Sequence, residues 1–276
     1  MINSINDCAV LNNGLDMPWL GLGVYKVKDG KEVEESVCAA LETGYRSIDT
    51  ASIYDNERGV GKAIRECGIP REEIFLTTKV WNSDMREKRT LDAFEESLEK
   101  LGTDYVDLYL IHWPVPGFYK HTWKDMENIC QSGRARAIGV SNFLIHHLQD
   151  LMSVNEVVPA VNQIEFHPYL VQPELLQFCQ DQGIRVEAWS PLMRGRILDH
   201  VSIQTIAEKH NRTPAQVVLR WDLQHGVVTI PKSVHRERIE ENSRIFDFEL
   251  SEADMVEIDS LDVNQRVGPD PDNFDL

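Results

Sequence analysis

Four polar residues occupy positions from which they could work together on one reacting group. Asp49, Lys79 and His112 each lie at the end of a β-rich run, and Tyr54 follows Asp49 by five positions. In a parallel barrel the carboxyl ends of the strands meet at one face, so these side chains would share a site. A buried ammonium is costly unless it is paired, and Asp49 is the expected partner of Lys79. The set predicts general acid–base chemistry.

Tyr54 is the expected proton donor of this set. A free tyrosine has a pKa of about 10, and a neighbouring ammonium favours the ionised form, so Lys79 is expected to lower the pKa of Tyr54. His112 would hydrogen-bond the same substrate oxygen and share its developing charge. General acid catalysis contributes roughly 10²- to 10⁴-fold, so a bound hydride donor must supply the rest. Taken singly, each residue also has an ordinary structural explanation as an ion pair, a core histidine or a loop aromatic.

The elements that would position these residues alternate along the chain. Eight short β-rich runs are separated by longer stretches whose apolar residues recur at three- and four-residue spacing. A hairpin is expected to turn at Asn12-Asn13-Gly14. The predicted strands are 20–24, 46–49, 74–80, 105–112, 135–140, 161–165, 185–189 and 227–230, and the clearest predicted helices are 32–43, 86–101 and 142–152. Eight βα units predict an α/β fold, a (β/α)₈ TIM barrel formed by one domain over residues 1–276.

A doubly wound open sheet is the alternative architecture. No G-x-G-x-x-G follows any predicted strand, and no Pro/Gly/Ser-rich linker divides the chain. Both observations favour the barrel. The segment after Leu261 has no periodicity, which leaves two explanations, a disordered end or a loop laid across the barrel mouth.

Composition limits the partners of this chain. Its 276 residues carry 45 acidic and 28 basic side chains, and the formal charge of −17 would repel nucleic acid and anionic lipid. No signal-like N-terminus and no run of 18 apolar residues is present, so a soluble, unprocessed, cytoplasmic protein is expected. Five scattered cysteines predict free thiols and argue against structural zinc. No heptad or long apolar edge is evident, and a monomer is expected.

Several segments of the chain resemble the signature segments of the aldo-keto reductases. They are Gly44-Tyr-Arg-Ser-Ile-Asp49-Thr-Ala-Ser-Ile-Tyr54, Thr78-Lys79-Val-Trp81, Asp107-Leu-Tyr-Leu-Ile-His112-Trp113-Pro114, Ala137-Ile-Gly-Val-Ser141-Asn142-Phe, Val161-Asn-Gln163-Ile-Glu, Ala188-Trp189-Ser190-Pro191-Leu192 and Ile230-Pro231-Lys232-Ser233. The likeness runs in order from the N-terminal hairpin to the C-terminal tail. It is closest in pattern to bacterial and protozoan members, such as 2,5-diketo-D-gluconic acid reductase, methylglyoxal reductase and prostaglandin F synthase-like enzymes.

The resemblance implies an NADPH-dependent oxidoreductase that reduces aldehydes, ketoaldehydes and ketones to alcohols. Hydride would pass from the nicotinamide to the carbonyl carbon, with Tyr54 as general acid and no metal. The implied catalytic tetrad is Asp49, Tyr54, Lys79 and His112. The implied cofactor-binding residues are Val24, Tyr25, Asp49, Ser141, Asn142, Gln163, Trp189, Ser190, Leu192, Lys232, Ser233, Val234, Arg238, Glu241 and Asn242. The implied substrate-binding residues are Tyr25, Tyr54, Trp81, His112 and Trp113. For Trp189, a buried strand aromatic is nearly as good an explanation.

A local cationic pair fits the phosphate end of such a cofactor. Lys232 and Arg238 flank the expected start of the last βα helix, where two cations would suit the 2′-phosphate of NADPH. The alternative is a solvated helix face, which the nearby Arg236, Glu237 and Glu240 also resemble.

Two other functions are alternatives to reduction of a carbonyl. A metal-dependent barrel hydrolase also uses polar residues at strand ends, but no H-x-H occurs. The adjacent His146 and His147 are expected to point apart on a helix. A non-enzymatic barrel that only binds the cofactor is the second alternative, and the complete tetrad argues against it.

Overall fold

The computed structural model describes residues 2–274, and its strands form two sheets. The strands are β1 (Cys8–Val10), β2 (Asp16–Pro18), β3 (Leu22–Gly23), β4 (Ser47–Asp49), β5 (Phe75–Val80), β6 (Val106–Ile111), β7 (Ala135–Ser141), β8 (Val161–Glu165), β9 (Arg185–Trp189) and β10 (Val228–Thr229). β1 and β2 form the antiparallel hairpin, and β3 to β10 form one parallel sheet in sequence order. Bridges from Leu20 to Thr229 and from Gly23 to Lys232 join its two edges. The predicted (β/α)₈ barrel is therefore confirmed.

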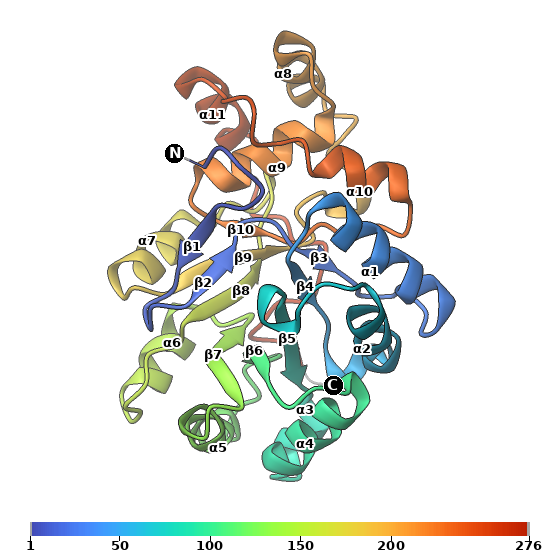
Figure 1. Ribbon diagram of the computed structural model, residues 1–276. Helices are drawn as coiled ribbons and strands as arrows, with labels where there is room; N and C mark the ends of the chain where they lie inside the picture. Colours follow the sequence, from blue (N-terminus) through green and yellow to red (C-terminus); the bar gives the residue numbers. More distant parts are fainter. Residues whose placement is uncertain (1, 275–276) are drawn as a thin grey trace.

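Helices surround this sheet, as Figure 1 shows. They are α1 (Lys31–Thr43), α2 (Glu57–Glu66), α3 (Asn82–Arg86), α4 (Thr90–Leu101), α5 (Tyr119–Gln131), α6 (Ile145–Met152), α7 (Pro173–Asp181), α8 (Val201–His210), α9 (Pro214–Gln224), α10 (Arg236–Asn242) and α11 (Glu252–Asp259). Within residues 2–274, no helix has the length and apolar character needed to cross a membrane.

The sequence-based element boundaries hold for the strands and fail for two helices. All eight predicted barrel strands are present, with ends displaced by at most two residues. The predicted helix 86–101 is wrong, because Lys88 adopts a left-handed φ of 56° and separates α3 from α4. The predicted helix 142–152 begins at residue 145 instead, because Asn142 has a φ of 65° and ends strand β7 in a turn.

The hairpin and the C-terminal tail lie at opposite ends of the barrel. The side-chain amide of Asn12 in the hairpin donates to the carbonyl of Pro159, just ahead of β8. At the other end of β8, Glu165 accepts hydrogen bonds from the backbone N–H groups of Val267 and Gly268. In Figure 1 the hairpin lies in front of the strands and the red tail passes behind them. The tail therefore crosses the carboxyl ends of the strands, where it forms part of the site.

Close aromatic packing between the strands and the helices holds these ends in place. Phe94 of α4 lies 4.8 Å from Tyr109 of β6, measured between ring centroids. On the far side of the barrel, Phe166 stacks on Trp221 of α9 at 4.7 Å. Trp221 and Tyr109 are fully buried. A dense core of this kind keeps the strand ends fixed relative to one another, which a site assembled from several strands requires.

Candidate active site

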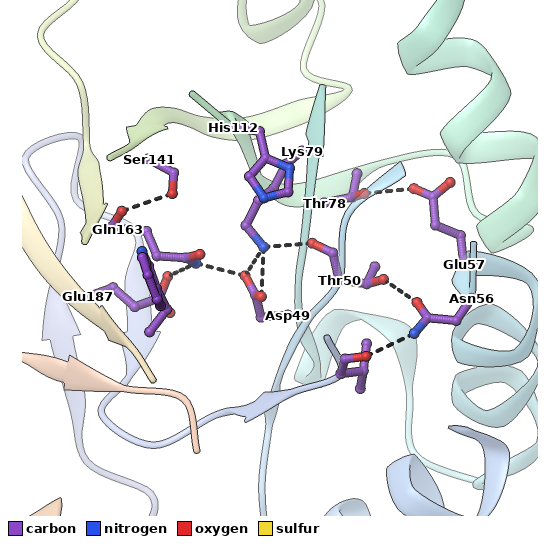
Figure 2. A network of polar contacts seen from close by, with 12 residues as sticks. Asp49, Thr50, Asn56, Glu57, Thr78, Lys79, His112, Ser141, Gln163 and Glu187 are labelled. Carbon is purple, nitrogen blue, oxygen red and sulfur yellow. Dashed lines mark hydrogen bonds and ion pairs between the residues drawn. The ribbon is translucent and has the colours of Figure 1, made fainter. Parts of the chain in front are cut away.

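A buried ion pair forms the base of the site. Lys79 on β5 directs its Nζ to both carboxylate oxygens of Asp49 on β4, at 2.7 and 2.8 Å, and to the carbonyl oxygen of Thr50 at 2.8 Å. Figure 2 shows the three contacts. The ammonium has three donors, so all are used, and the lysine is completely buried. The predicted pairing of these residues is confirmed.

Tyr54 lies above this pair, at the end of a 3₁₀ turn that follows β4. Lys79 Nζ lies 5.1 Å from the centroid of the tyrosine ring. Ser52, in the same turn, donates a hydrogen bond to the carbonyl oxygen of Lys79 at 2.9 Å. A short local turn thus ties the tyrosine to the strand that carries the lysine.

The expected effect of Lys79 on the acidity of Tyr54 is wrong for this structure. Burial, followed by the charge of Asp49, raises the pKa of Tyr54 well above its ordinary value. Burial and the Asp49 carboxylate, which lies 2.7 Å from Lys79 Nζ, outweigh the opposite effect of the ammonium. Tyr54 therefore keeps its proton throughout the neutral range and can act as a donor.

His112 follows the end of β6 and completes the polar cluster. Its ring lies edge-on to Tyr54, with centroids 5.6 Å apart, and edge-on to Trp81 at 5.0 Å. Burial, and then the charge of Lys79, lowers the pKa of His112 well below its usual range. Its Nδ1 has no hydrogen-bond partner among the described residues. A neutral imidazole therefore lies edge-on beside the tyrosine.

Aromatic side chains from four segments surround the cluster. Tyr25 lies 5.0 Å from Tyr54 between ring centroids, and Trp113 lies 4.0 Å from Phe274. Trp81 lies 6.3 Å from the same phenylalanine. All of the residues predicted to contact substrate thus gather at one mouth. Phe274 was missed, because a single aromatic residue in an aperiodic tail gives no signal of where it packs.

The tail reaches this position through a close contact at Gly268. A Cβ atom at this position would lie 2.4 Å from Cη2 of Trp189, closer than real Cβ atoms approach. The indole is itself held, because its Nε1 donates to Asn142 Oδ1 at 2.8 Å. Only glycine lets the tail lie this close to Trp189.

Replacing Gly268 by valine is therefore expected to displace the tail and with it Phe274. We expect kcat/KM for carbonyl substrates to fall on the order of tenfold, because small displacements at a site are costly. Steady-state kinetics measure this, with Val263→Ala as a control in an exposed part of the tail. Unchanged kinetics in Gly268→Val would show that the tail does not shape the site.

Three polar residues that the family resemblance implies for cofactor binding, Ser141, Asn142 and Gln163, also meet here. Ser141 Oγ donates to the backbone oxygen of Gln163 at 2.9 Å, and Asn142 Nδ2 donates to the backbone oxygen of His112 at 3.0 Å. Asn142 and Ser190 both have left-handed φ values, 65° and 55°. Such conformations are unusual outside glycine and occur often at functional sites.

Gln163 connects this group to the ion pair, and it also contacts Glu187, which the sequence analysis does not include among the candidate residues. Its Nε2 donates to Asp49 Oδ2 at 2.8 Å and to Glu187 Oε2 at 2.6 Å. Figure 2 shows Gln163 between the two carboxyl groups. Glu187 is completely buried. The sequence does contain an indication of this residue. Glu187 is an acidic residue between Val186 and Ala188 in a predicted parallel strand, where a nearly continuous apolar run is usual.

The residues predicted for the phosphate end of the cofactor, and their neighbours, lie in the loop after β10 and in α10. Lys232 and Arg238 are exposed and Ser233 is buried. Glu241 accepts a hydrogen bond from Thr213 Oγ1 at 2.8 Å. Four other residues are predicted to contact the cofactor. Val24 and Asn242 are buried, and Leu192 and Val234 are partly buried.

The histidine pair on α6 differs from expectation, because the rings of His146 and His147 lie 4.0 Å apart instead of pointing apart. Both lie in the first turn of the helix and reach Asp272 Oδ1, at 3.0 and 3.4 Å. The backbone N–H of Leu144 donates to His147 Nδ1, so the neutral ring carries its proton on Nε2, facing Asp272. The two histidines therefore bind the C-terminal tail through Asp272.

Residues 19–263 of this chain match the model of the aldo/keto reductase family. The glyoxal reductase of Bacillus subtilis (strain 168) is 59% identical over 274 residues, 99% of each chain. The 9,11-endoperoxide prostaglandin H2 reductase of Trypanosoma cruzi (strain CL Brener) is 52% identical over 276 residues, 99% of this chain and 98% of that protein. The crystal structure of a Gox0644 mutant in complex with NADPH is 46% identical, with a TM-score of 0.93 and 98% of each chain covered.

Proposed function

Because this chain belongs to the aldo/keto reductase family, we propose that it reduces aldehydes, ketoaldehydes and ketones to alcohols, with Tyr54 as the general acid. It is an NADPH-dependent carbonyl-reducing enzyme. The observation that carries the assignment of Tyr54 is its position over the buried Lys79–Asp49 pair and beside a neutral His112. No other tyrosine within residues 2–274 has this combination of neighbours.

The described residues fit NADPH at both ends of the molecule. The side chains of Lys232 and Arg238 have no hydrogen-bond or ion-pair partner among residues 2–274, although the chain has an excess of 17 negative charges. Two unpaired cationic side chains from this one segment of the chain suit a phosphate dianion. At the other end, Ser141, Asn142 and Gln163 offer amide and hydroxyl groups for the carboxamide, and the Trp189 ring offers a flat surface.

The proposed reaction needs one proton and one hydride. NADPH supplies the hydride, which forms the new bond to the carbonyl carbon. The proton on Tyr54 Oη moves to the carbonyl oxygen, and the tyrosine recovers a proton from solvent after the alcohol leaves. The neutral His112 hydrogen-bonds the same oxygen and orients the substrate. Lys79 places a fixed positive charge below the ring, which stabilises the phenolate that forms as the proton leaves.

Small ketoaldehydes and planar aldehydes are the proposed substrates. Tyr25, Trp81, Trp113 and Phe274 form aromatic walls close to the tyrosine, and such walls favour compact or flat molecules. The name of the Bacillus subtilis relative, a glyoxal reductase, points to small α-dicarbonyl compounds, the class to which α-ketoaldehydes also belong.

A panel of carbonyl compounds tests this function directly. We expect glyoxal, α-ketoaldehydes and aromatic aldehydes to oxidise NADPH, with NADH slower by roughly tenfold or more, because a hydrogen bond to a charged group contributes about 1.5–3 kcal/mol. The assay follows consumption of each cofactor spectroscopically and identifies the alcohol product by mass spectrometry. Tight NADPH binding without reduction of any carbonyl would instead favour the non-enzymatic barrel.

A further inference from the structure

The carboxyl group of Glu187 lies directly beside the proposed catalytic cluster, yet the mechanism above does not use it. Its Oε2 accepts from Gln163 Nε2 at 2.6 Å, and that same nitrogen donates to Asp49 at 2.8 Å. Both protons of the Gln163 side-chain amide are therefore spent on carboxyl groups. As a result, the orientation of the amide is fixed, and its carbonyl oxygen is left to accept a hydrogen bond.

The two carboxyl groups do not carry the same charge. Asp49 is paired with Lys79 at 2.7 Å, whereas Glu187 Oε1 has no hydrogen-bond partner among the described residues. An ionised carboxylate with an unsatisfied buried oxygen is far more costly than a neutral acid in the same place. Burial, and then the charge of Asp49, raises the pKa of Glu187 to about 8, against the lowering influence of Gln163 and Lys79. The resting site thus holds a neutral Glu187 and a single ion pair.

We propose that Glu187 is a proton-linked positioning residue: it orients the Gln163 amide oxygen toward the cofactor, and its charge sets the balance between bound NADPH and bound NADP⁺. This proposal rests on the proposed function. The nicotinamide ring is neutral in NADPH and positively charged in NADP⁺. A second buried carboxylate next to the residue that holds the carboxamide therefore favours NADP⁺, and protonation of that carboxylate removes this preference.

The linkage predicts a pH dependence with a definite sign. Glu187 changes from neutral to ionised as pH rises through about 8. The ratio of the dissociation constants of NADP⁺ and NADPH should therefore fall several-fold as pH rises through about 8. His112 and Tyr54 do not titrate in this window, since their pKa values lie well below and well above their ordinary values. The 2′-phosphate is common to both cofactors, so its own titration cancels in the ratio.

Titrations of the full chain with NADPH and with NADP⁺ between pH 6 and 9.5 test the proposal, with quenching of tryptophan fluorescence as the signal. We expect Glu187→Gln to abolish the pH dependence and to keep the low-pH ratio, because glutamine is neutral and its Oε1 still accepts from Gln163. Glu187→Leu removes that acceptor, and it should weaken both cofactors together.

The matched control is Glu57→Gln. Glu57 is another buried glutamate with a pKa raised by burial, but it bonds to Thr78 on the outer side of the barrel wall. We expect this variant to keep the pH dependence of the parent. A ratio independent of pH in the parent, or a dependence that survives in Glu187→Gln, would overturn the proposal. Either result differs from failure of the proposed function, which would appear as no cofactor binding or no carbonyl reduction by the parent.

Stability gives an independent measurement of the same proton. An unfolded glutamate releases its proton near pH 4.3, whereas the folded chain holds it to about pH 8. Between these values the folded state binds more protons than the unfolded state, so this group makes unfolding easier as pH rises. Glu187→Gln should lessen the decline of Tm between pH 5 and 8. An unchanged decline would mean that Glu187 is ionised in the folded chain, which would contradict the proposal.

Discussion

Replacing Tyr54 by phenylalanine is expected to reduce kcat by roughly 10²- to 10⁴-fold, the usual contribution of a positioned general acid, while NADPH affinity changes little. The variant loses only the hydroxyl group. Its ring still faces Tyr25 at 5.0 Å and covers Lys79 Nζ at 5.1 Å. Among residues 2–274 no side chain or backbone group hydrogen-bonds that hydroxyl, so its removal leaves no partner unsatisfied. The expected loss therefore belongs to the chemical step.

Single-turnover kinetics with NADPH bound in advance separate this loss from an effect on cofactor binding. Tyr105→Phe is the matched control, because Tyr105 lies at the amino end of β6 against Arg71, far from the strand ends that carry the cluster. It should keep the turnover of the parent. Full activity in Tyr54→Phe would remove the tyrosine from the mechanism and leave His112 as the remaining candidate acid.

The barrel and the base of the site could be predicted from the sequence because local signals were strong there. Eight β-rich runs at regular spacing define the strands, and residues at strand ends necessarily meet at one face of a parallel barrel. The pairing of Lys79 with Asp49 followed from the cost of burying a lone ammonium. Each of these inferences depends on a short segment and one general rule.

The remaining features depend on contacts between segments far apart in the sequence. Phe274 reaches Trp113 only because Gly268 passes close to Trp189 and Glu165 holds the backbone there. The acidity of Tyr54 was misjudged for a related reason. A neighbouring ammonium lowers a tyrosine pKa, but burial and the carboxylate of Asp49 oppose that effect here, and both are visible only in three dimensions.

Lys79→Met should cause the largest loss of stability among the substitutions considered. It leaves the Asp49 carboxylate buried, with Gln163 Nε2 at 2.8 Å as its remaining donor among the described residues. Breaking a buried ion pair by removing one partner costs about 3–5 kcal/mol. For a chain of this size, such a cost corresponds to a Tm lowered on the order of 10 °C. Thermal unfolding followed by circular dichroism measures it, and catalytic activity should be lost as well.

Two companion variants distinguish an uncompensated charge from a simple loss of packing. Lys62→Met removes the lysine of an exposed pair with Glu34, where water screens both charges, and its Tm should stay close to that of the parent. The double variant Asp49→Asn with Lys79→Met removes both buried charges, so it should regain a large part of the lost stability while remaining inactive. If the double variant were instead less stable than Lys79→Met, the pair would owe its contribution to shape. In that case the positive charge of Lys79 would follow from a side chain that is retained for packing. Recovery of Tm without activity would instead mean that the buried ion pair destabilises the fold and is retained because it places a positive charge beneath Tyr54.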